Sequence, residues 1–165
     1  RTDPLTGILN RRGYMEKLGQ DVATAGNAGK FAIAVYADMN NLKVVNDRYG
    51  HEEGDAALRA VAMILQDTIL HFNKEGEVGR LGGDEYLIST AMIPEEEFRR
   101  QLKESTQNFN EKSDKPYQVT MSAGICQFRC SWRVDVDTEL DKADRKLYID
   151  KKEKPQSIVK TTQNS

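Results

Sequence analysis

The sequence lacks a marked excess of charge of either sign, and this excludes one large class of partner. Its 165 residues include 24 Lys and Arg against 26 Asp and Glu, which gives a formal net charge of -2. A surface that binds a nucleic-acid backbone needs a local excess of basic residues to neutralise the phosphates. We therefore expect no nucleic-acid partner, and we expect any phosphate ligand to be held by a local site that includes a metal ion.

Long apolar runs and paired cysteine motifs are also missing. The longest wholly apolar run, residues 31–37, is far shorter than the roughly 20 residues that a helix needs to span a membrane. The two cysteines, Cys126 and Cys130, do not form a CxxC pair and have no histidine near them in sequence. We interpret them as reduced thiols of a cytoplasmic domain and not as ligands of zinc.

Length and composition predict a single domain. A chain of 165 residues can build a core without disulfides, and 30% charged with 38% hydrophobic residues is typical of soluble globular proteins. Because the chain begins at Arg1 without Met, we expect it to be part of a longer protein, and any membrane attachment to belong to that longer protein. The domain is predicted to span residues 1–154, followed by a polar, frayed tail over 155–165.

The most informative stretch is residues 80–88, where two glycines and two carboxylates lie between predicted strands. Strands are predicted over 78–81 and 86–92, so that Gly82 and Gly83 form the tip of a hairpin. Glycine can adopt positive φ and leaves the backbone open to a ligand. An ordinary polar turn has a similar composition, so the hairpin alone is compatible with both a binding site and a plain turn.

Carboxylates at two separate places in the chain are candidates for a shared site. Neighbouring side chains of a strand point to opposite faces, so of Asp84 and Glu85 we expect only Asp84 to share a site with the glycines. Asp38 follows the apolar run 31–37, which predicts a central strand buried on both faces. If this strand lies beside the hairpin, Asp38 and Asp84 converge at one edge and can bind a divalent metal with a nucleotide phosphate.

The remaining segments predict helices around an antiparallel sheet. Helices are expected to start at Asn10, near Asn40 or Asn41 acting as a cap, at Asp55 after a loop over 49–54, at Pro94, and at Val136. Two of them carry a predicted apolar stripe: Leu58, Val61, Ile64, Leu65, Thr68 and Phe72 in the helix from Asp55, and Leu140, Ala143, Leu147 and Tyr148 in the last helix. A further strand is predicted from Tyr117 to Phe128, with close backbone packing at Gly124. The order of these elements favours an α+β fold with a mainly antiparallel central sheet flanked by helices.

Six motifs together resemble the GGDEF family, the diguanylate cyclases of bacterial signalling. They occur in the order of the family and nearly span the chain: Asp3-Pro4-Leu5-Thr6-Gly7 with Asn10-Arg11-Arg12, Asp38-x-Asn40-x-Leu42-Lys43-x-x-Asn46-Asp47, Gly50-His51-x-x-Gly54-Asp55, Gly82-Gly83-Asp84-Glu85-Tyr86, Ser122-x-Gly124, and Ala143-Asp144-x-x-Leu147-Tyr148. The signature carries Tyr86 where the family has Phe. A single such motif would be weak, whereas six in register are specific.

The resemblance implies a fold like the palm of nucleotide cyclases and polymerases, and the condensation of two GTP into cyclic di-GMP with release of pyrophosphate. Each domain would hold one GTP, and a transient or regulated homodimer would bring two GTP molecules together. An upstream sensor or regulatory domain of the same longer chain would control this pairing.

The resemblance also implies roles for individual residues. Asp38, Asp84 and the backbone carbonyl of Met39 match the ligands of two Mg²⁺ ions, with Mn²⁺ as an alternative. Asp38, Asp84 and Glu85 match the catalytic positions, and Asp84 would also help to deprotonate the 3′-hydroxyl. The substrate-binding positions match Gly82, Gly83, Asn46, Asp55, Lys43 and Lys151. Asn46 and Asp55 would read guanine, while Lys43 and Lys151 would hold phosphates.

The sequence departs from the family pattern in three places, the first of which also lacks the aromatic residue that the family often has near Asn41-Leu42. Asn40 stands where the family often has a second Asp, and Pro155 stands where a basic residue usually follows Lys151 by four. The RxxD site for product inhibition is absent, because its window reads Asn73-Lys74-Glu75-Gly76.

Plainer interpretations of the same residues remain open at this stage. Asn40, Asn41 and Asp55 can be simple helix caps or helix-start charges, and Lys151, Lys152 and Lys154 a solvated helix end. The alternative functions are a catalytically weak GTP-binding regulatory GGDEF module and a purely structural interaction domain.

Overall fold

The computed structural model describes residues 1–24, 27–72 and 76–153. Its elements are β1 (Leu9–Asn10), α1 (Arg11–Ala23), β2 (Phe31–Met39), α2 (Leu42–Tyr49), α3 (His51–His71), β3 (Gly76–Gly82), β4 (Glu85–Ala91), α4 (Glu95–Lys112), β5 (Met121–Arg129) and α5 (Val136–Glu153). The sheet has the strand order β1-β3-β4-β2-β5, and its pairs are antiparallel except for β1 with β3. This confirms the predicted α+β class and the central position of the apolar strand.

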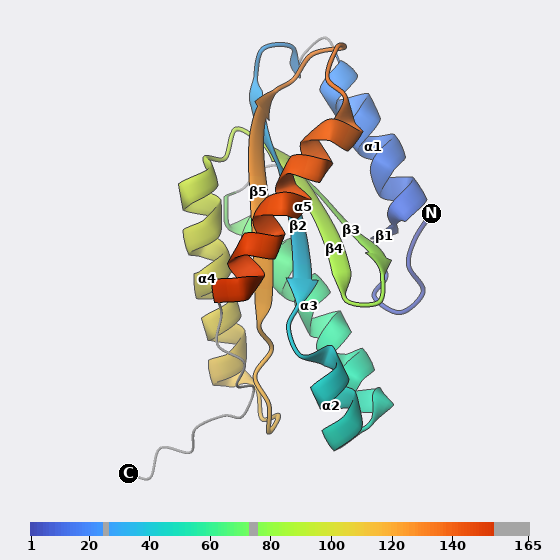
Figure 1. The fold of residues 1–165 in the computed structure, drawn as a ribbon, viewed down its shortest axis with the longest axis vertical. Coiled ribbons are helices and arrows are strands. Elements are labelled where there is room, and N and C mark those ends of the chain that lie inside the picture. Colours follow the sequence, from blue (N-terminus) through green and yellow to red (C-terminus); the bar gives the residue numbers. More distant parts are fainter. Residues whose placement is uncertain (25–26, 73–75, 154–165) are drawn as a thin grey trace.

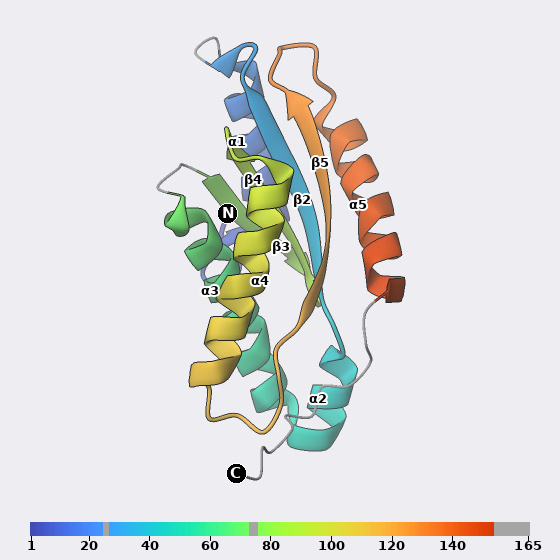
Figure 2. The same cartoon turned by 90° about the vertical axis from the view of Figure 1, so that its left-hand side faces the viewer.

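Helices cover both faces of the sheet. Figures 1 and 2 show α1 and α5 on one face and α3 and α4 on the other, with α2 beyond the end of β2. The alternation of β2 explains this arrangement, because Ala32 and Ala34 pack with side chains of α1 and α5 while Ile33 and Val35 pack with side chains of α3 and α4. A strand that is apolar at every position can bury both of its faces.

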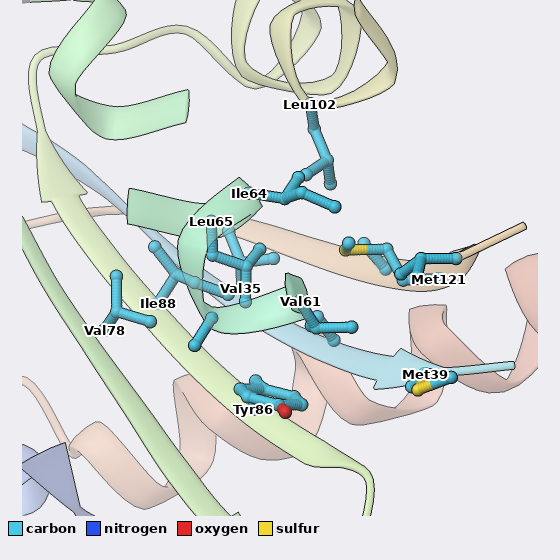
Figure 3. Close-up of a cluster of buried hydrophobic side chains, with 14 of the residues drawn as sticks. Val35, Met39, Val61, Ile64, Leu65, Val78, Tyr86, Ile88, Leu102 and Met121 are labelled. Atoms are coloured by element: carbon cyan, nitrogen blue, oxygen red, sulfur yellow. The ribbon is translucent and has the colours of Figure 1, made fainter. Parts of the chain in front are cut away.

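The larger core lies between the sheet and α3. Figure 3 shows Val35 and Ile88 of the sheet packed near Val61 and Leu65 of α3, and these four side chains are buried. The predicted apolar stripe of this helix is therefore confirmed. In addition, the hydroxyl of Tyr86 donates to the backbone carbonyl of Leu58 at 2.7 Å, which ties the start of β4 to α3.

Close packing of α5 on β5 is confirmed at Gly124. A Cβ at this position would lie 1.9 Å from the carbonyl oxygen of Ala143 and 2.2 Å from the backbone nitrogen of Leu147. No side chain fits in that space, so the glycine allows the helix backbone to rest on the strand. The prediction that Tyr148 also faces inward is wrong, because this side chain is 63% exposed.

The outer edge of β5 is bonded to two helices. The backbone nitrogen of Ala123 donates to Asp150 Oδ2 of α5 at 2.8 Å. The carbonyl oxygen of Ala123 accepts from Arg99 Nη1 of α4 at 3.4 Å. Main-chain groups that face away from the rest of the sheet thus have partners at this point.

The region between β2 and α3 differs from the prediction. The N-cap position of α2 is Asn41, which has φ 63° and makes no capping hydrogen bond through its side chain. Asn40 Oδ1 instead accepts from the hydroxyl of Ser122 on β5 at 3.0 Å, so neither asparagine caps the helix.

The predicted loop over 49–54 is also wrong, since α3 begins at His51 directly after Gly50. Asp55 therefore lies in the second turn of α3 and not at its start.

The predicted strand from Tyr117 begins four residues late, at Met121. Asn110 of α4 explains the difference, because its side chain bonds both backbone groups of Val119, at 2.9 Å to the nitrogen and 2.8 Å to the carbonyl. Both backbone groups of Val119 are thus satisfied without a strand neighbour.

None of the helices in the described part of the chain has the length and apolar character needed to cross a bilayer. The predicted tail 155–165, Lys154 and residues 73–75 lie outside the described residues.

Candidate active site

The tip of the β3–β4 hairpin depends on its glycines. Gly82 pairs with Glu85 across the hairpin, and Gly83 and Asp84 form the turn between the strands. Gly82 has φ 137° and Gly83 has φ 51°, conformations that other residues rarely adopt. A Cβ at either position would meet no atom within 4 Å, so the backbone conformation and not crowding requires glycine. The open space beside both residues leaves the turn accessible to a ligand.

The structure confirms that Asp38 and Asp84 converge. The backbone nitrogen of Met39 donates to the carbonyl oxygen of Asp84 at 2.9 Å, and Asp38 pairs in register with Glu85. The prediction that strand alternation keeps Glu85 away from this site is wrong. Directly opposed residues of neighbouring strands lie on the same face, and alternation does not apply to Asp84 because it lies in the turn. All three carboxylates therefore gather at the end of β2.

The carboxylate of Asp38 is the most perturbed acid of this group. Asp38 is 8% exposed, and Lys151 Nζ of α5 lies 2.5 Å from its Oδ2. Burial raises the pKa of Asp38 to about 6, and the negative charge of Asp84 adds to this rise, while the hydrogen bond from Lys151 opposes it. The same hydrogen bond raises the pKa of Lys151. Lys151 is thus a cation held at the carboxylate and not a freely solvated helix end.

One oxygen of this carboxylate is available to a cation. Oδ1 of Asp38 is buried and has no hydrogen-bond partner among the described residues, which is unfavourable for a charged group unless a ligand pairs with it. The neighbouring donors are oxygens, which suit hard divalent cations. Within the ranges that the structure describes, no group of three or more His, Cys, Asp or Glu is placed to hold a metal. The donor set fits a cation that takes its remaining ligands from phosphate and water.

The signature turn is connected to the beginning of the chain through Arg80, a residue that the motif analysis did not select. Arg80 donates to the carbonyl oxygen of Gly83 through Nε at 3.0 Å and Nη2 at 2.8 Å. Its Nη1 lies 3.0 Å and 3.2 Å from the two carboxylate oxygens of Asp3. Asp3 also accepts from the backbone nitrogen and the hydroxyl of Thr6, at 2.9 Å and 2.7 Å. The only sequence signal for this link was the Asp3–Gly7 motif itself.

A second group of predicted residues lies where α2 meets α3. A Cβ on Gly54 would lie 1.7 Å from Oδ1 of Asn46, so Asn46 packs directly against the residue that precedes Asp55. Asp55 is exposed. The structure therefore brings Asn46 and Asp55 to one corner, which we call the α2–α3 corner (residues 46–55). Lys43 is exposed in the first turn of α2, which begins three residues after Met39.

Comparison with known proteins accounts for this combination of a carboxylate pair with a glycine turn. The sequence profile of the family described as "Diguanylate cyclase, GGDEF domain" matches residues 1–157. The chain belongs to the GGDEF family. Diguanylate cyclase DgcP of Escherichia coli (strain K12) is 32% identical over 158 residues, which cover 93% of this chain and 45% of that protein. The chain spans less than half the length of the first curated relatives it matches.

Solved GGDEF structures share the fold. The GGDEF domain of DgcB from Caulobacter crescentus, solved in complex with c-di-GMP, has a TM-score of 0.80 at 22% identity, with 96% of this chain and 94% of that chain covered. Diguanylate cyclase SiaD from Pseudomonas aeruginosa, solved with its activator SiaC, has a TM-score of 0.78 at 24% identity, with 94% of this chain and 59% of that chain covered. At these identities the likeness establishes the fold, and the predicted palm-like architecture is confirmed.

Proposed function

We propose that this GGDEF domain is an active diguanylate cyclase that condenses two GTP into cyclic di-GMP. The observation that carries the proposal is the meeting of Asp38 with the intact signature turn, linked by the 2.9 Å hydrogen bond from Met39 to Asp84. Membership of the family supports it, as does the buried oxygen of Asp38 that has no partner among the described residues.

Asp38, Asp84 and the backbone carbonyl of Met39 would hold divalent cations, two Mg²⁺ in the proposed form of the site. When bound, these ions supply positive charge that stabilises the attacking and leaving oxygens of a phosphoryl transfer. Lys151, already a cation at Asp38, would then turn to the triphosphate together with Lys43. The exposed glycine turn would let the nucleotide lie against the backbone of residues 82–83.

The reaction requires two copies of the domain. Each 3′-hydroxyl attacks the α-phosphorus of the other nucleotide, a new O3′–P bond forms, and the bond from the α-phosphorus to the β-phosphate oxygen breaks to release pyrophosphate. Asp84 would help to accept the proton of the 3′-hydroxyl, and Glu85, on the same face as Asp38, would complete the acidic group. Each domain contributes one GTP, so the site is complete only in a homodimer, which we expect an upstream domain to control in the cytoplasm.

The α2–α3 corner would provide the preference for guanine. The carboxylate of Asp55 can accept from N1–H and from the N2 amino group, and the amide of Asn46 can donate to an acceptor on the base. Adenine lacks that pair of donors, and leaving the polar groups of the protein unpaired would weaken its complex by about 1–3 kcal/mol.

The test is turnover by the chain fused to a dimerisation segment, because a domain that pairs weakly needs a high effective concentration. Incubation with GTP and Mg²⁺ should yield cyclic di-GMP and two equivalents of pyrophosphate, and Asp84→Ala should abolish both. Asp67→Ala, which removes an exposed carboxylate of α3, is the matched control and should retain activity. Absence of product from the fused dimer, or product that survives Asp84→Ala, would refute the proposal.

The same assay distinguishes the alternative of a GTP-binding regulatory module. The substitution of Asn40 at a position where the family often has Asp favours this alternative, because the amide of Asn40 is bonded to Ser122 and brings no negative charge to the site. Tight GTP binding in calorimetry without turnover in the fused dimer would support it.

A further inference from the structure

Tyr117 connects the two helices that form the α2–α3 corner. It belongs to the segment that joins α4 to β5 in the chain, and its side chain is 1% exposed. Its ring centroid is 5.3 Å from that of Tyr49, the last residue of α2. Its hydroxyl lies 2.8 Å from Glu53 Oε2 and 3.1 Å from the Glu53 carbonyl oxygen, both in the first turn of α3. A buried tyrosine hydroxyl requires such an acceptor, so this side chain fixes Glu53 while its ring packs on Tyr49.

Glu53 is held by a second residue of the same segment. Lys115 Nζ lies 2.9 Å from Glu53 Oε1, so each carboxylate oxygen has one partner. The hydrogen bonds from Lys115 and Tyr117 hold the pKa of Glu53 below its usual value. The carboxylate is therefore ionised at neutral pH and accepts from both residues.

The two helices of the corner are joined by a very short link. The single residue between α2 and α3 is Gly50, which has φ 95° and would meet nothing within 4 Å if it carried a Cβ. The two helices also contact each other directly, because Asn46 approaches Gly54 and Val45 of α2 is buried in the same apolar cluster as Ala57 and Leu58 of α3. Tyr117 adds contacts from outside the corner, because its ring packs on Tyr49 of α2 and its hydroxyl bonds to Glu53 of α3.

The residues proposed to read guanine lie on both sides of these contacts. Asn46 is three residues before Tyr49 on α2, and Asp55 is two residues after Glu53 on α3. Hydrogen bonds to a base edge discriminate only when donors and acceptors are placed to within a few tenths of an ångström. A small rotation of α3 against α2 would separate the two groups from the base.

We propose that Tyr117 and Glu53 form a positioning pair that sets the guanine selectivity of the α2–α3 corner. Neither residue contacts the nucleotide in this proposal. The inference rests on the proposed GTP-binding function and adds to it the residues that determine how well the base is read.

The experiment compares the binding of 3′-deoxy-GTP and 3′-deoxy-ITP to the chain in the presence of Mg²⁺, by calorimetry. Both nucleotides lack the attacking hydroxyl and are not turned over, and hypoxanthine lacks the N2 amino group of guanine. Wild type should prefer the guanine nucleotide. Tyr117→Phe, which removes only the hydroxyl, should weaken 3′-deoxy-GTP binding about tenfold and affect 3′-deoxy-ITP less, so that the ratio of the two affinities falls.

Glu53→Gln should lower the same ratio, because the amide leaves one acceptor oxygen for the two donors Tyr117 and Lys115. The double variant should lose less than the sum of the two single ones, because the two residues share a hydrogen bond. Glu104→Gln is the matched control, since it removes an equal charge at an exposed position of α4 outside the corner and should leave the ratio unchanged. Thermal unfolding of each variant separates selectivity from stability.

The possible results separate this inference from the proposed function. If Tyr117→Phe and Glu53→Gln lower the unfolding temperature but leave the ratio of affinities unchanged, the pair is purely structural and the inference is overturned, while GTP binding stands. If wild type binds neither nucleotide, the proposed function fails and the inference fails with it.

Discussion

The carboxylate of Glu139 on α5 accepts from the Sγ of Cys126 on β5 at 3.0 Å. Burial of the thiol is the largest cause, and the neighbouring Glu139 the next, of a rise in the pKa of Cys126 to about 11. Burial raises the pKa of the second free thiol, Cys130, as well. Since the thiolate and not the thiol is the nucleophile, these cysteines are poor targets for oxidation or alkylation.

We predict that Cys126 in the folded protein reacts with iodoacetamide at pH 8 about a hundredfold more slowly than in the unfolded chain. The reason is that a rise in pKa from 9.0 to about 11 lowers the fraction of thiolate by about that factor. The same shift lowers the free energy of unfolding as the pH rises from about 9 to 11, since only the unfolded chain then releases the proton. Peptide mapping of native and urea-unfolded samples measures the rates. Glu139→Gln should speed the native reaction, and equal rates in both states would contradict the prediction.

Individual polar side chains were the hardest part of the site to predict from the sequence. The cap preference of asparagine is correct for Asn10, whose Oδ1 accepts from the backbone nitrogen of Gly13 at 2.9 Å. The same preference fails for Asn40, because Ser122, 82 residues away, offers a buried partner. A local rule describes local competition only, and tertiary contacts decide when a distant partner exists.

At the scale of elements, the signature hairpin and the lead-in turn over residues 3–7 behave as one unit. Arg80 bonds to Gly83 on one side and to Asp3 on the other, and the side chain of Arg80 is only 12% exposed in this pair. The carbonyl of Gly83 immediately precedes Asp84, so the guanidinium fixes the backbone that carries a proposed metal ligand.

We predict that Arg80→Lys lowers kcat of the fused dimer about ten- to a hundredfold, because lysine keeps the charge but loses the planar set of donors that holds both partners. Circular dichroism should show a folded protein. Arg100→Lys, at an exposed position of α4, is the control and should retain full turnover. An unchanged kcat together with a lower unfolding temperature would show that Arg80 serves stability alone.

The elements themselves were largely predictable, and the exceptions have a physical cause. The apolar run of β2 and the periodic stripe of α3 are properties of the sequence that directly determine burial, and both are confirmed. The predicted start of α3 was wrong because the polar stretch between Gly50 and Gly54 suggested a loop. In the structure a single residue at positive φ, Gly50, is enough to separate the two helices. Arg80 and Tyr117 could not be found from periodicity, since their partners are distant in sequence.

At the scale of the whole molecule, the start of β3 is incompatible with the family's product-inhibition motif. The motif would require Asp at Gly76, but a Cβ there would lie 2.8 Å from the carbonyl oxygen of Ser89 and 3.1 Å from side-chain carbons of Ile69. The absence of the motif from residues 73–76 is therefore matched by a lack of space at its last position.

We predict that cyclic di-GMP added in large excess over the protein inhibits turnover only in competition with GTP. Initial rates at several GTP concentrations, with and without product, measure this effect. Saturating GTP should restore the full rate, because the sequence at 73–76 carries no RxxD motif. A lowered maximal rate at saturating GTP would contradict it.

The bonds from Asp150 and Arg99 to the outer edge of β5 have a consequence for how the domain can be shortened. An unpaired edge strand is a template on which other chains add, and proteins protect such edges with covering elements and charges. The last turn of α5 provides that protection one residue before Lys151. A truncation before Asp150 would remove Lys151, the cation at Asp38, and would also expose an edge of the sheet that is prone to aggregation. An inactive truncated protein would therefore reflect lower solubility as much as the loss of an active-site residue.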